Sequence, residues 1–359
     1  MAKVRGIGSR SVSRTVFLTA LALAAACVAT PPAVAQTVPA GPSAEARAAD
    51  LEQRRVKLER AHSATVGILA TAVEDARSNE TLGRTRTGSG VLIEDGLVLT
   101  IGYLILEAER VDLVMKDGRK VPARVVAYDL ASGFGLLQAL TPTGAAAAPI
   151  GASGATTTDE PLVVMSGGEE SGLSLARLVS RRDFAGYWEY HIEGALFTAP
   201  ARGDHSGAGL FNAEGELVGI GSLVVGDAGG AERPGIRGNM FVPLDLLKPI
   251  FSELRTQGVS RSSHRPWLGV SSVEYGGQVR VLRVNRESPA SDAGLQPGDA
   301  IVGVDGMPVR DLAGFYKALW KNPVSEREVA LEVRRGAETV RIGVKSVDRM
   351  KTLSRPQGV

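Results

Sequence analysis

Cysteine is nearly absent from this sequence, because Cys27 is its one cysteine and lies in an N-terminal segment that we expect to be removed. An exported chain without cysteine forms no disulfide bond and offers no thiol nucleophile, so packing alone must hold it together. Histidine is also scarce, with four residues scattered along 359 positions. These histidines have no spacing typical of metal ligands, and we expect neither a metal ion nor another cofactor.

The first 35 residues have the three parts of a secretory signal. Residues 1–14 carry four basic and no acidic side chains, residues 15–29 form an apolar run, and small residues end the segment at Ala35. This order predicts a signal peptide over residues 1–35, cleaved near Ala35, and therefore an exported protein. An uncleaved membrane anchor is the alternative, although the apolar run is shorter than the ~20 residues that a spanning helix needs.

A strong charge of either sign is also missing. Removal of residues 1–35, with their four basic and no acidic side chains, changes the formal net charge from +2 to −2. The basicity therefore belongs to the signal segment, and we expect no nucleic-acid partner.

Short β-prone runs separated by glycine fill two stretches, residues 64–140 and 161–244. Runs with this spacing are typical of antiparallel sandwiches and barrels. Residues 141–160 contain few large side chains and provide a connection between the two halves. The sequence therefore predicts an all-β double barrel over residues 64–258, with a cleft between its halves.

Helical segments flank the predicted barrels. Residues 36–63 form an N-terminal arm in which residues 43–62 are rich in Ala, Leu, Glu and Arg. Too few apolar residues are present for a broad apolar face, so we expect a solvated helix, with a partner-contacting arm as the alternative. Residues 245–258 have apolar positions at helical spacing, and Gly258 provides a helix stop.

The C-terminal third of the chain has a different pattern. A short polar linker is expected at residues 259–266, followed by a smaller α+β module at residues 267–347 and a tail at residues 348–359. Within the module, residues 311–322 predict a helix whose side chains at helical spacing are Leu312, Phe315, Tyr316 and Leu319.

One serine stands where a nucleophile would need sharp backbone geometry. Ser206 lies in the run ARGDHSGAGL, residues 201–210, among small and flexible residues. Asp204 and His205 directly precede it, but neighbouring side chains on a tight turn diverge, whereas a catalytic imidazole must lie within ~3 Å of the serine hydroxyl. His191 is another candidate base only if its strand brings it into the cleft.

Three motifs resemble those of a known family. GSGVLIEDGLVLT, HSGAGLFNAEGELVGIGS and NMFVPLDLLKPIFSEL are similar to segments of the high-temperature-requirement (HtrA) serine proteases, whose protease domain is a trypsin-like double β-barrel. SPASDAGLQPGDAIVGVDG resembles the most characteristic stretch of a PDZ domain. The resemblance covers about residues 64–347, and it implies a trypsin-like domain at residues 64–258 and a PDZ domain at residues 267–347.

The resemblance implies that two of the family's three catalytic positions hold residues here that cannot act as the base or the acid of a triad. Tyr103 stands in the place of the histidine base, and a phenol with an ordinary pKa near ~10 is a poor proton acceptor at neutral pH. Gly133 stands in the place of the acid and has no side chain to orient a base. Only Ser206, at the nucleophile position, is retained. Asp204 replaces a glycine of the oxyanion hole, where we expect its carboxylate to repel the developing negative charge.

The PDZ-like module, by contrast, retains the parts that peptide binding needs. By resemblance, the run Trp267-Leu268-Gly269-Val270 presents backbone N–H groups to a peptide's terminal carboxylate, and the next strand accepts the peptide as an added strand. The helix at residues 311–322 forms the other wall, with Phe315 and Leu319 shaping the apolar pocket. Most side chains of that helix are nevertheless expected to belong to the core.

These features favour an exported, non-catalytic HtrA-like protein of the periplasm, a pseudoprotease in envelope protein quality control or a scaffold. Its expected partners are peptide C-termini or unfolded proteins, bound through the PDZ domain. Two alternatives stay open: an active serine endopeptidase that uses Ser206 with an unrecognised base, and a holdase or regulatory subunit that assembles with an active paralogue. A homotrimer is typical of the family, but the arm before residue 64 has no obvious aromatic clasp, so the oligomeric state stays open.

Overall fold

The computed structural model describes residues 43–169 and 171–354. The predicted signal peptide, residues 1–35, lies outside the described residues. Within the described part of the chain, no helix is long and apolar enough to cross a membrane.

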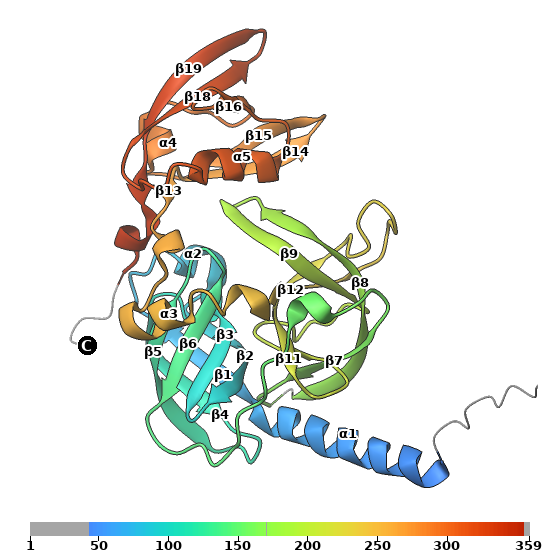
Figure 1. Cartoon of the computed structure of the whole chain (residues 1–359). Helices are drawn as coiled ribbons and strands as arrows, with labels where there is room; N and C mark the ends of the chain where they lie inside the picture. Colours follow the sequence, from blue (N-terminus) through green and yellow to red (C-terminus); the bar gives the residue numbers. More distant parts are fainter. Residues whose placement is uncertain (1–42, 170, 355–359) are drawn as a thin grey trace, which may run out of the picture. The chain divides into compact units, whose positions relative to one another are not determined.

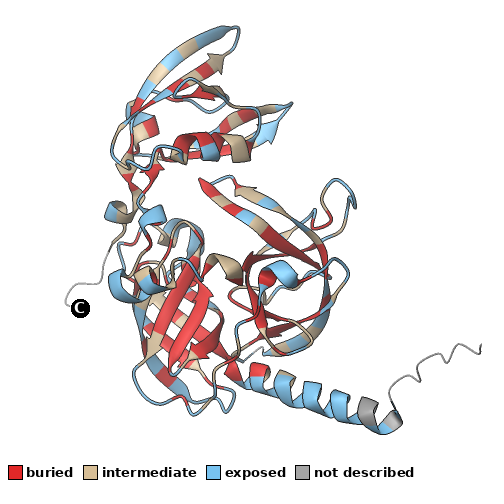
Figure 2. Cartoon of the chain, in the orientation of Figure 1, coloured by how far each residue is buried: buried red, intermediate tan, exposed pale blue. Residues whose placement is uncertain are grey.

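The described N-terminal segment is a helix, as the sequence predicts. Helix α1 spans Ala44–Ala64 and carries exposed side chains along most of its length (Figure 2). Leu51 and Val56 are among its exposed residues. Its C-terminal end is fixed differently, because Ala61 and Ala64 are fully buried in the main core and Arg60 Nε donates to the carbonyl oxygen of Ala147.

Two closed antiparallel barrels follow, which confirms the predicted fold class (Figure 1). The first barrel has the order β1-β2-β3-β6-β5-β4 and the second has the order β10-β11-β12-β9-β8-β7. Figure 1 draws the first in blue to green and the second in green to yellow. The strands of the first barrel are β1 (Thr65–Ala72), β2 (Thr85–Glu94), β3 (Leu97–Ile101), β4 (Ala108–Val114), β5 (Lys120–Tyr128) and β6 (Phe134–Ala139). The strands of the second are β7 (Pro161–Ser166), β8 (Gly172–Gly186), β9 (Tyr190–Ala199), β10 (Gly209–Phe211), β11 (Leu217–Val225) and β12 (Gly238–Pro243).

Burial follows the strand pattern that the sequence displays. All five residues of β3 are buried, and β5 alternates between exposed and buried positions in its first half. Most of the buried apolar side chains of both barrels form one continuous core. Burial of apolar area contributes roughly 25 cal/mol per Å² removed from water, so this core stabilises both barrels.

The predicted helix at residues 245–258 is only partly correct. A short 3₁₀ turn covers Leu244–Leu246, and helix α3 spans Phe251–Gln257. Pro249 lies between the two, and a proline disfavours helical geometry at the residue before it and provides no N–H group. The predicted stop is present, because Gly258 has a left-handed conformation with φ 77°.

The predicted polar linker, residues 259–266, packs against the first barrel. Ser260 and Ser263 are fully buried, and a 3₁₀ turn covers Arg261–Ser263. Both serines bind the buried carboxylate of Asp129, at 3.1 Å from Ser260 N and 2.6 Å from Ser263 Oγ. The linker is thus polar in sequence yet partly buried, because two of its serines pair with a buried charge.

The C-terminal module is a small α+β fold with its own core. Its main sheet has the order β14-β15-β16-β18-β19, and helix α5 (Leu312–Trp320) packs on it. Asp311 caps α5 by accepting the Gly314 N–H at 2.6 Å. The strands are β13 (Pro266–Trp267), β14 (Val270–Tyr275), β15 (Gln278–Val284), β16 (Ala300–Val304), β17 (Met307–Pro308), β18 (Glu328–Arg335), β19 (Glu338–Lys345) and β20 (Val347–Asp348), and the other helices are α4 (Pro289–Asp292) and, in the first barrel, α2 (Asn79–Leu82).

Candidate functional site

Ser206 lies on the loop between β9 and β10, where the second barrel meets the first. Its carbonyl oxygen accepts a hydrogen bond from Ser89 N on β2, at 2.8 Å, and the next residue, Gly207, donates to Gly221 O on β11, at 2.8 Å. Gly207 has φ 73°, and a Cβ at this position would collide with the carbonyl oxygen of Ser89. The local sequence therefore needs glycine after Ser206, because only glycine fits this close approach.

Tyr103 occupies the position next to the serine hydroxyl. It lies in the 3₁₀ turn Gly102–Leu104 that directly follows β3. Its Oη lies 2.7 Å from Ser206 Oγ and 3.0 Å from the carbonyl oxygen of Ser222. Burial raises the pKa of Tyr103 to about 12. At neutral pH the phenol therefore keeps its proton and cannot accept the one on Ser206.

Gly133 leaves a space that another side chain fills. The hydroxyl of Tyr190, the first residue of β9, donates to the carbonyl oxygen of Ser132 at 3.2 Å. A Cβ added at Gly133 would collide with that hydroxyl, and Gly133 has φ 79°, which disfavours any other residue. Burial raises the pKa of Tyr190, so it also stays protonated. No carboxylate at position 133 could orient a base without a shift of Tyr190.

Asp129 is the neighbouring acid of the same turn, and its role is structural. It is fully buried and accepts hydrogen bonds from Ser132 N and Ser132 Oγ, at 2.9 and 2.6 Å, besides those from the linker serines. Burial raises its pKa, but the hydrogen bonds outweigh burial and hold the pKa below its ordinary value. Asp129 therefore binds the turn before β6 to the segment that leaves the barrels.

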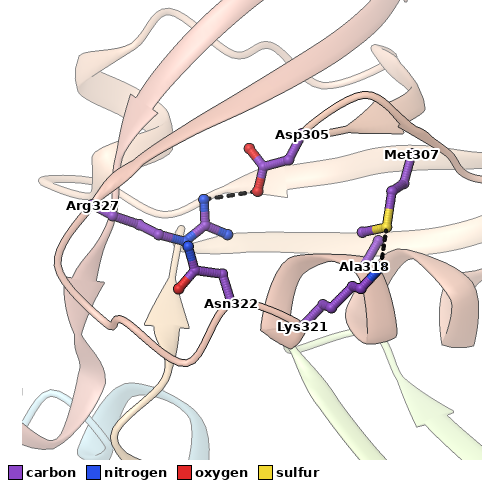
Figure 3. A pocket seen from close by; sticks show the side chains of 6 residues that line it. All are labelled: Asp305, Met307, Ala318, Lys321, Asn322 and Arg327. Carbon is purple, nitrogen blue, oxygen red and sulfur yellow. Dashed lines mark hydrogen bonds and ion pairs between the residues drawn. The ribbon is translucent and has the colours of Figure 1, made fainter.

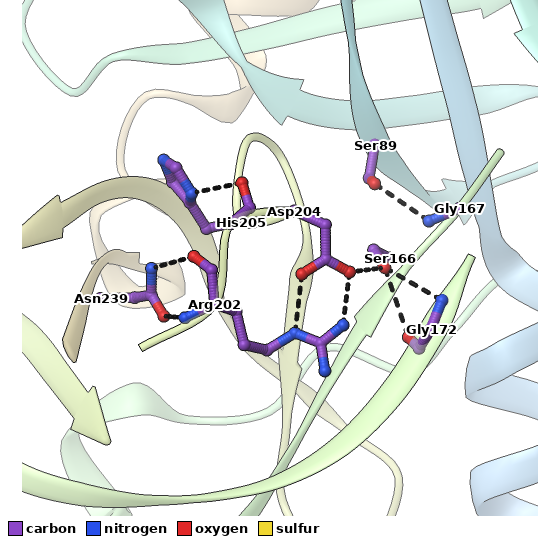
Figure 4. Close-up of polar contacts among 9 residues, drawn as sticks. Ser89, Ser166, Gly167, Gly172, Arg202, Asp204, His205 and Asn239 are labelled. Atoms are coloured by element: carbon purple, nitrogen blue, oxygen red, sulfur yellow. Dashed lines mark hydrogen bonds and ion pairs between the residues drawn. The ribbon is translucent and has the colours of Figure 1, made fainter. Parts of the chain in front are cut away.

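The adjacent residues Asp204 and His205 have partners other than Ser206 (Figure 4). The Asp204 carboxylate pairs with the guanidinium of Arg202, with Arg202 Nε at 2.8 Å, and accepts a short hydrogen bond from Ser166. Burial raises the pKa of Asp204, but Arg202 and Ser166 outweigh it and the pKa is lowered. His205 Nδ1 lies 3.0 Å from Gly203 O. Arg202 partly compensates the charge of Asp204, which reduces the repulsion that we expect this carboxylate to exert on an oxyanion.

His191 is largely buried and lies close to Asp183. Its Nε2 lies 3.4 Å from Asp183 on the neighbouring strand β8, and Lys317 of α5 binds the same aspartate at 2.8 Å. Burial lowers the pKa of His191, so the ring is mainly neutral at pH 7. The contacts of His191 thus lie toward the C-terminal module.

In the C-terminal module, the loop Leu268–Val270 binds a carboxylate of the same chain. Leu268 N, Gly269 N and Val270 N donate to the side chain of Glu189, at 3.1, 2.7 and 2.9 Å. Glu189 lies in the turn between β8 and β9 and is 4% exposed. Burial raises its pKa, although these three hydrogen bonds act in the opposite direction.

The remaining residues expected in the peptide site belong to the module's framework. Phe315 and Leu319 are fully buried in its core, and Trp267 pairs with Val347 between β13 and β20. The guanidinium carbon of Arg349 lies 4.5 Å from the centre of the Trp267 ring.

Two cavities lie near the residues described above. A cavity of about 1550 Å³ is lined by residues of the first barrel, the β8–β9 turn and the C-terminal module, among them Tyr103, Trp188 and Trp267. A second, of about 510 Å³, lies between β17 and the end of α5 (Figure 3). In it Arg327 and Asp305 form an ion pair at 2.7 Å. Among the described residues, no group of three or more His, Cys, Asp or Glu side chains could hold a metal ion.

Sequence reasoning identified Tyr103, Gly133 and Ser206 but missed Glu189 and Tyr190. Neither of these stands in a motif. Glu189 and the loop that it contacts are about 80 residues apart in the chain, so no local pattern could indicate their contact.

Comparisons with known proteins agree with this architecture. Residues 88–220 match the trypsin-like peptidase domain, and residues 266–345 match the PDZ domain. The chain is 25% identical over 307 residues to a probable periplasmic serine endoprotease, DegP-like, of Hahella chejuensis, covering 76% of this chain and 60% of that protein. It is 26% identical over 259 residues to the periplasmic serine endoprotease DegP of Escherichia coli K12, covering 67% of this chain and 52% of that protein.

Solved structures show the same fold. An HtrA-type protease, AlgW with decapeptide, is 18% identical and superimposes with a TM-score of 0.51, covering 84% of this chain and 99% of that one. The serine endoprotease from Yersinia pestis is 20% identical with a TM-score of 0.50, covering 82% and 97%.

The chain is thus a trypsin-like double barrel followed by a PDZ domain. It is similar in sequence to HtrA-type and DegP-like serine proteases, and it spans 52 to 70% of the length of the curated relatives that it matches.

Proposed function

We propose that this protein is a non-catalytic member of the HtrA family. It acts in the periplasm after cleavage of its signal peptide and binds peptide C-termini or unfolded proteins through its PDZ domain. The observation that carries the proposal is the hydrogen bond between Tyr103 Oη and Ser206 Oγ, 2.7 Å long, in the place where the family has a histidine base.

Replacement of the histidine base by a tyrosine is expected to reduce the catalytic rate strongly. A serine hydroxyl is nearly unreactive until a base removes its proton, and loss of triad members reduces the rate by roughly 10⁴- to 10⁶-fold. With a pKa of about 12, Tyr103 does not supply that base at neutral pH. Tyr190 further supports the proposal, because its hydroxyl lies where a side chain at position 133 would begin.

Labelling with a fluorophosphonate probe tests the lack of activation at Ser206. We expect no labelling of the wild-type protein at pH 7 to 8 and no difference from the matched variant Ser206→Ala. Cleavage of casein is expected to be absent from both. The family's active enzymes, represented by DegP of Escherichia coli, serve as the positive control for the probe.

Labelling of wild-type protein that is lost in Ser206→Ala would contradict the proposal. It would instead support the alternative of a serine endopeptidase with an unrecognised base. The variant His205→Ala would then show whether the histidine adjacent to Ser206 is that base.

A further inference from the structure

The turn between β8 and β9 places a carboxylate in the loop that the PDZ domain would use for a peptide's C-terminus. Leu268 N, Gly269 N and Val270 N all donate to Glu189, at 2.7 to 3.1 Å. A terminal carboxylate bound by a PDZ domain uses backbone N–H groups in the same way. The donors of the loop are therefore already satisfied by a side chain of this protein.

The backbone of the turn also takes positions that a bound peptide would need. Ser272 N on β14 donates to Tyr187 O at 2.8 Å, a bond of the kind that an added strand would make. On the other wall, the Tyr316 hydroxyl of α5 donates to Gly186 O at 2.6 Å and accepts the Glu189 N–H at 3.1 Å. The turn thus lies between β14 and α5.

The backbone at Glu189 has an unfavourable conformation that surrounding contacts stabilise. Glu189 has φ 58°, a left-handed value that disfavours a side chain larger than glycine. Arg265 Nη2 donates to the carbonyl oxygen of Glu189 at 3.3 Å, and Arg265 itself is buried beneath the ring of Trp320. Such strain persists only where surrounding contacts outweigh it.

We propose that the β8–β9 turn, through Glu189, is an internal ligand of the PDZ domain that competes with the C-terminal carboxylates of external peptides. The inference rests on the proposed peptide-binding function and adds a closed state to it. Glu189 must leave the loop before an external carboxylate enters. The apparent peptide affinity is therefore the affinity of the open state multiplied by the fraction of molecules that are open.

Release of the turn has a consequence at the emptied catalytic centre. Tyr190 follows Glu189 directly, and its ring stacks on Trp188 at 5.6 Å between centres while its hydroxyl lies against Gly133. Because the same turn contacts both places, a peptide that displaces Glu189 also disturbs the cover over Gly133.

Peptide arrays provide the first test. Arrays of decapeptides with free C-terminal carboxylates, and the same arrays with C-terminal amides, are incubated with wild-type protein, Glu189→Ala and Glu189→Gln. We expect Glu189→Ala to bind free-carboxylate peptides about tenfold more tightly, since it loses hydrogen bonds to a charged group, with no gain on the amides. Glu193→Gln is the matched control, because Glu193 is an exposed carboxylate on β9, the strand that follows the turn, and it should behave as wild type.

Hydrogen exchange provides a second test that needs no peptide. The amides of Leu268, Gly269 and Val270 should be protected in the wild-type protein and exchange faster in Glu189→Gln, which keeps the size of the side chain but not its charge. Amides in the buried strand β16 monitor the folding of each variant and should not change.

The outcomes separate this inference from the proposed function. If wild type and Glu189→Ala bind the arrays equally and the loop amides exchange equally fast, the internal ligand is overturned. If no variant binds any peptide but Glu189→Gln loses loop protection, the internal ligand is supported and peptide binding by this domain fails.

Discussion

Tyr103 and Ser206 share a hydrogen bond of 2.7 Å, and under the proposed function the pair does not act as a nucleophile and its base. Burial raises the pKa of Tyr103 to about 12, so its proton remains on the phenol throughout the physiological range. The single substitution at position 103 therefore changes the chemistry of the pair even though the serine and its loop are retained. The position of Ser206, set by Ser89 and Gly207, does not depend on catalysis.

Position 133 offers a test at the scale of single residues. Gly133→Ala adds a Cβ against the Tyr190 hydroxyl at a backbone with φ 79°, and we expect a loss of about 1–3 kcal/mol in the free energy of unfolding. Gly118→Ala is the matched control, because Gly118 has φ 80° and open space around it, so it reports the backbone cost alone. Urea denaturation measures both.

A third variant isolates the contribution of the hydroxyl. In a Tyr190→Phe background, the cost of Gly133→Ala should fall toward that of Gly118→Ala, because the clashing atom is gone. Equal costs for Gly133→Ala with and without the Tyr190 hydroxyl would show that this hydroxyl does not restrict the space at position 133.

Among the elements, the segment after α3 departs most from its sequence pattern. Its serines look like those of a solvated linker, but Ser260 and Ser263 bind Asp129, which also holds Ser132. Polar residues in a short connection predict solvent exposure only when no buried charge is available to pair with them. The partner, Asp129, lies about 130 residues earlier in the chain.

Asp129 should therefore stabilise the junction between elements. We expect Asp129→Ala to lower the free energy of unfolding by about 3 kcal/mol at pH 7, because it removes hydrogen bonds to a buried charge and leaves their donors unpaired. Asp95→Asn, at an exposed turn, serves as the control and should change stability by less than about 0.5 kcal/mol.

The pH dependence of this effect has a definite sign. Since the folded-state pKa of Asp129 lies below its ordinary value of ~3.9, the carboxylate stabilises the fold fully above that value. The difference in stability between wild type and Asp129→Asn should shrink as the pH falls through the lowered pKa. A difference that grows on acidification would contradict the role given to the charge.

For the molecule as a whole, the described residues between Glu45 and Ser354 form one compact unit although they comprise two barrels and a PDZ domain. Buried contacts contribute to this unity, because Glu189 binds the PDZ loop and Tyr316 binds Gly186. The C-terminal tail adds another link, with Ser354 N donating to Glu107 of the first barrel at 2.7 Å. Such contacts couple domains that would otherwise move independently.

Coupling of the domains predicts one thermal transition for the wild-type chain. Glu189→Lys places a cation against the loop N–H groups, so the PDZ domain should separate from the barrels and unfold in its own transition. Differential scanning calorimetry measures the number of transitions, with Glu193→Lys as the control that keeps one. Two well-separated transitions in the wild-type protein would show that the contact does not couple the domains.

The sequence by itself determined the two barrels and the PDZ domain, and its resemblance to the HtrA proteases predicts which residues stand at the three triad positions. These features are carried by short-range patterns: strand alternation, turn glycines and contiguous motifs. The residues Tyr103, Gly133 and Ser206 could therefore be read directly, and the hydrogen bond between the first and the last agrees with their placement in one site.

Only the tertiary structure decided what fills the two sites. Tyr190 covers Gly133, and Glu189 occupies the loop at Leu268. These two consecutive residues, at the end of the turn between β8 and β9, thus contact two segments that are distant from the turn in the sequence. Which side chain enters a cavity depends on the path of a complete hairpin and on the free energy of burial, and neither is encoded in a local pattern.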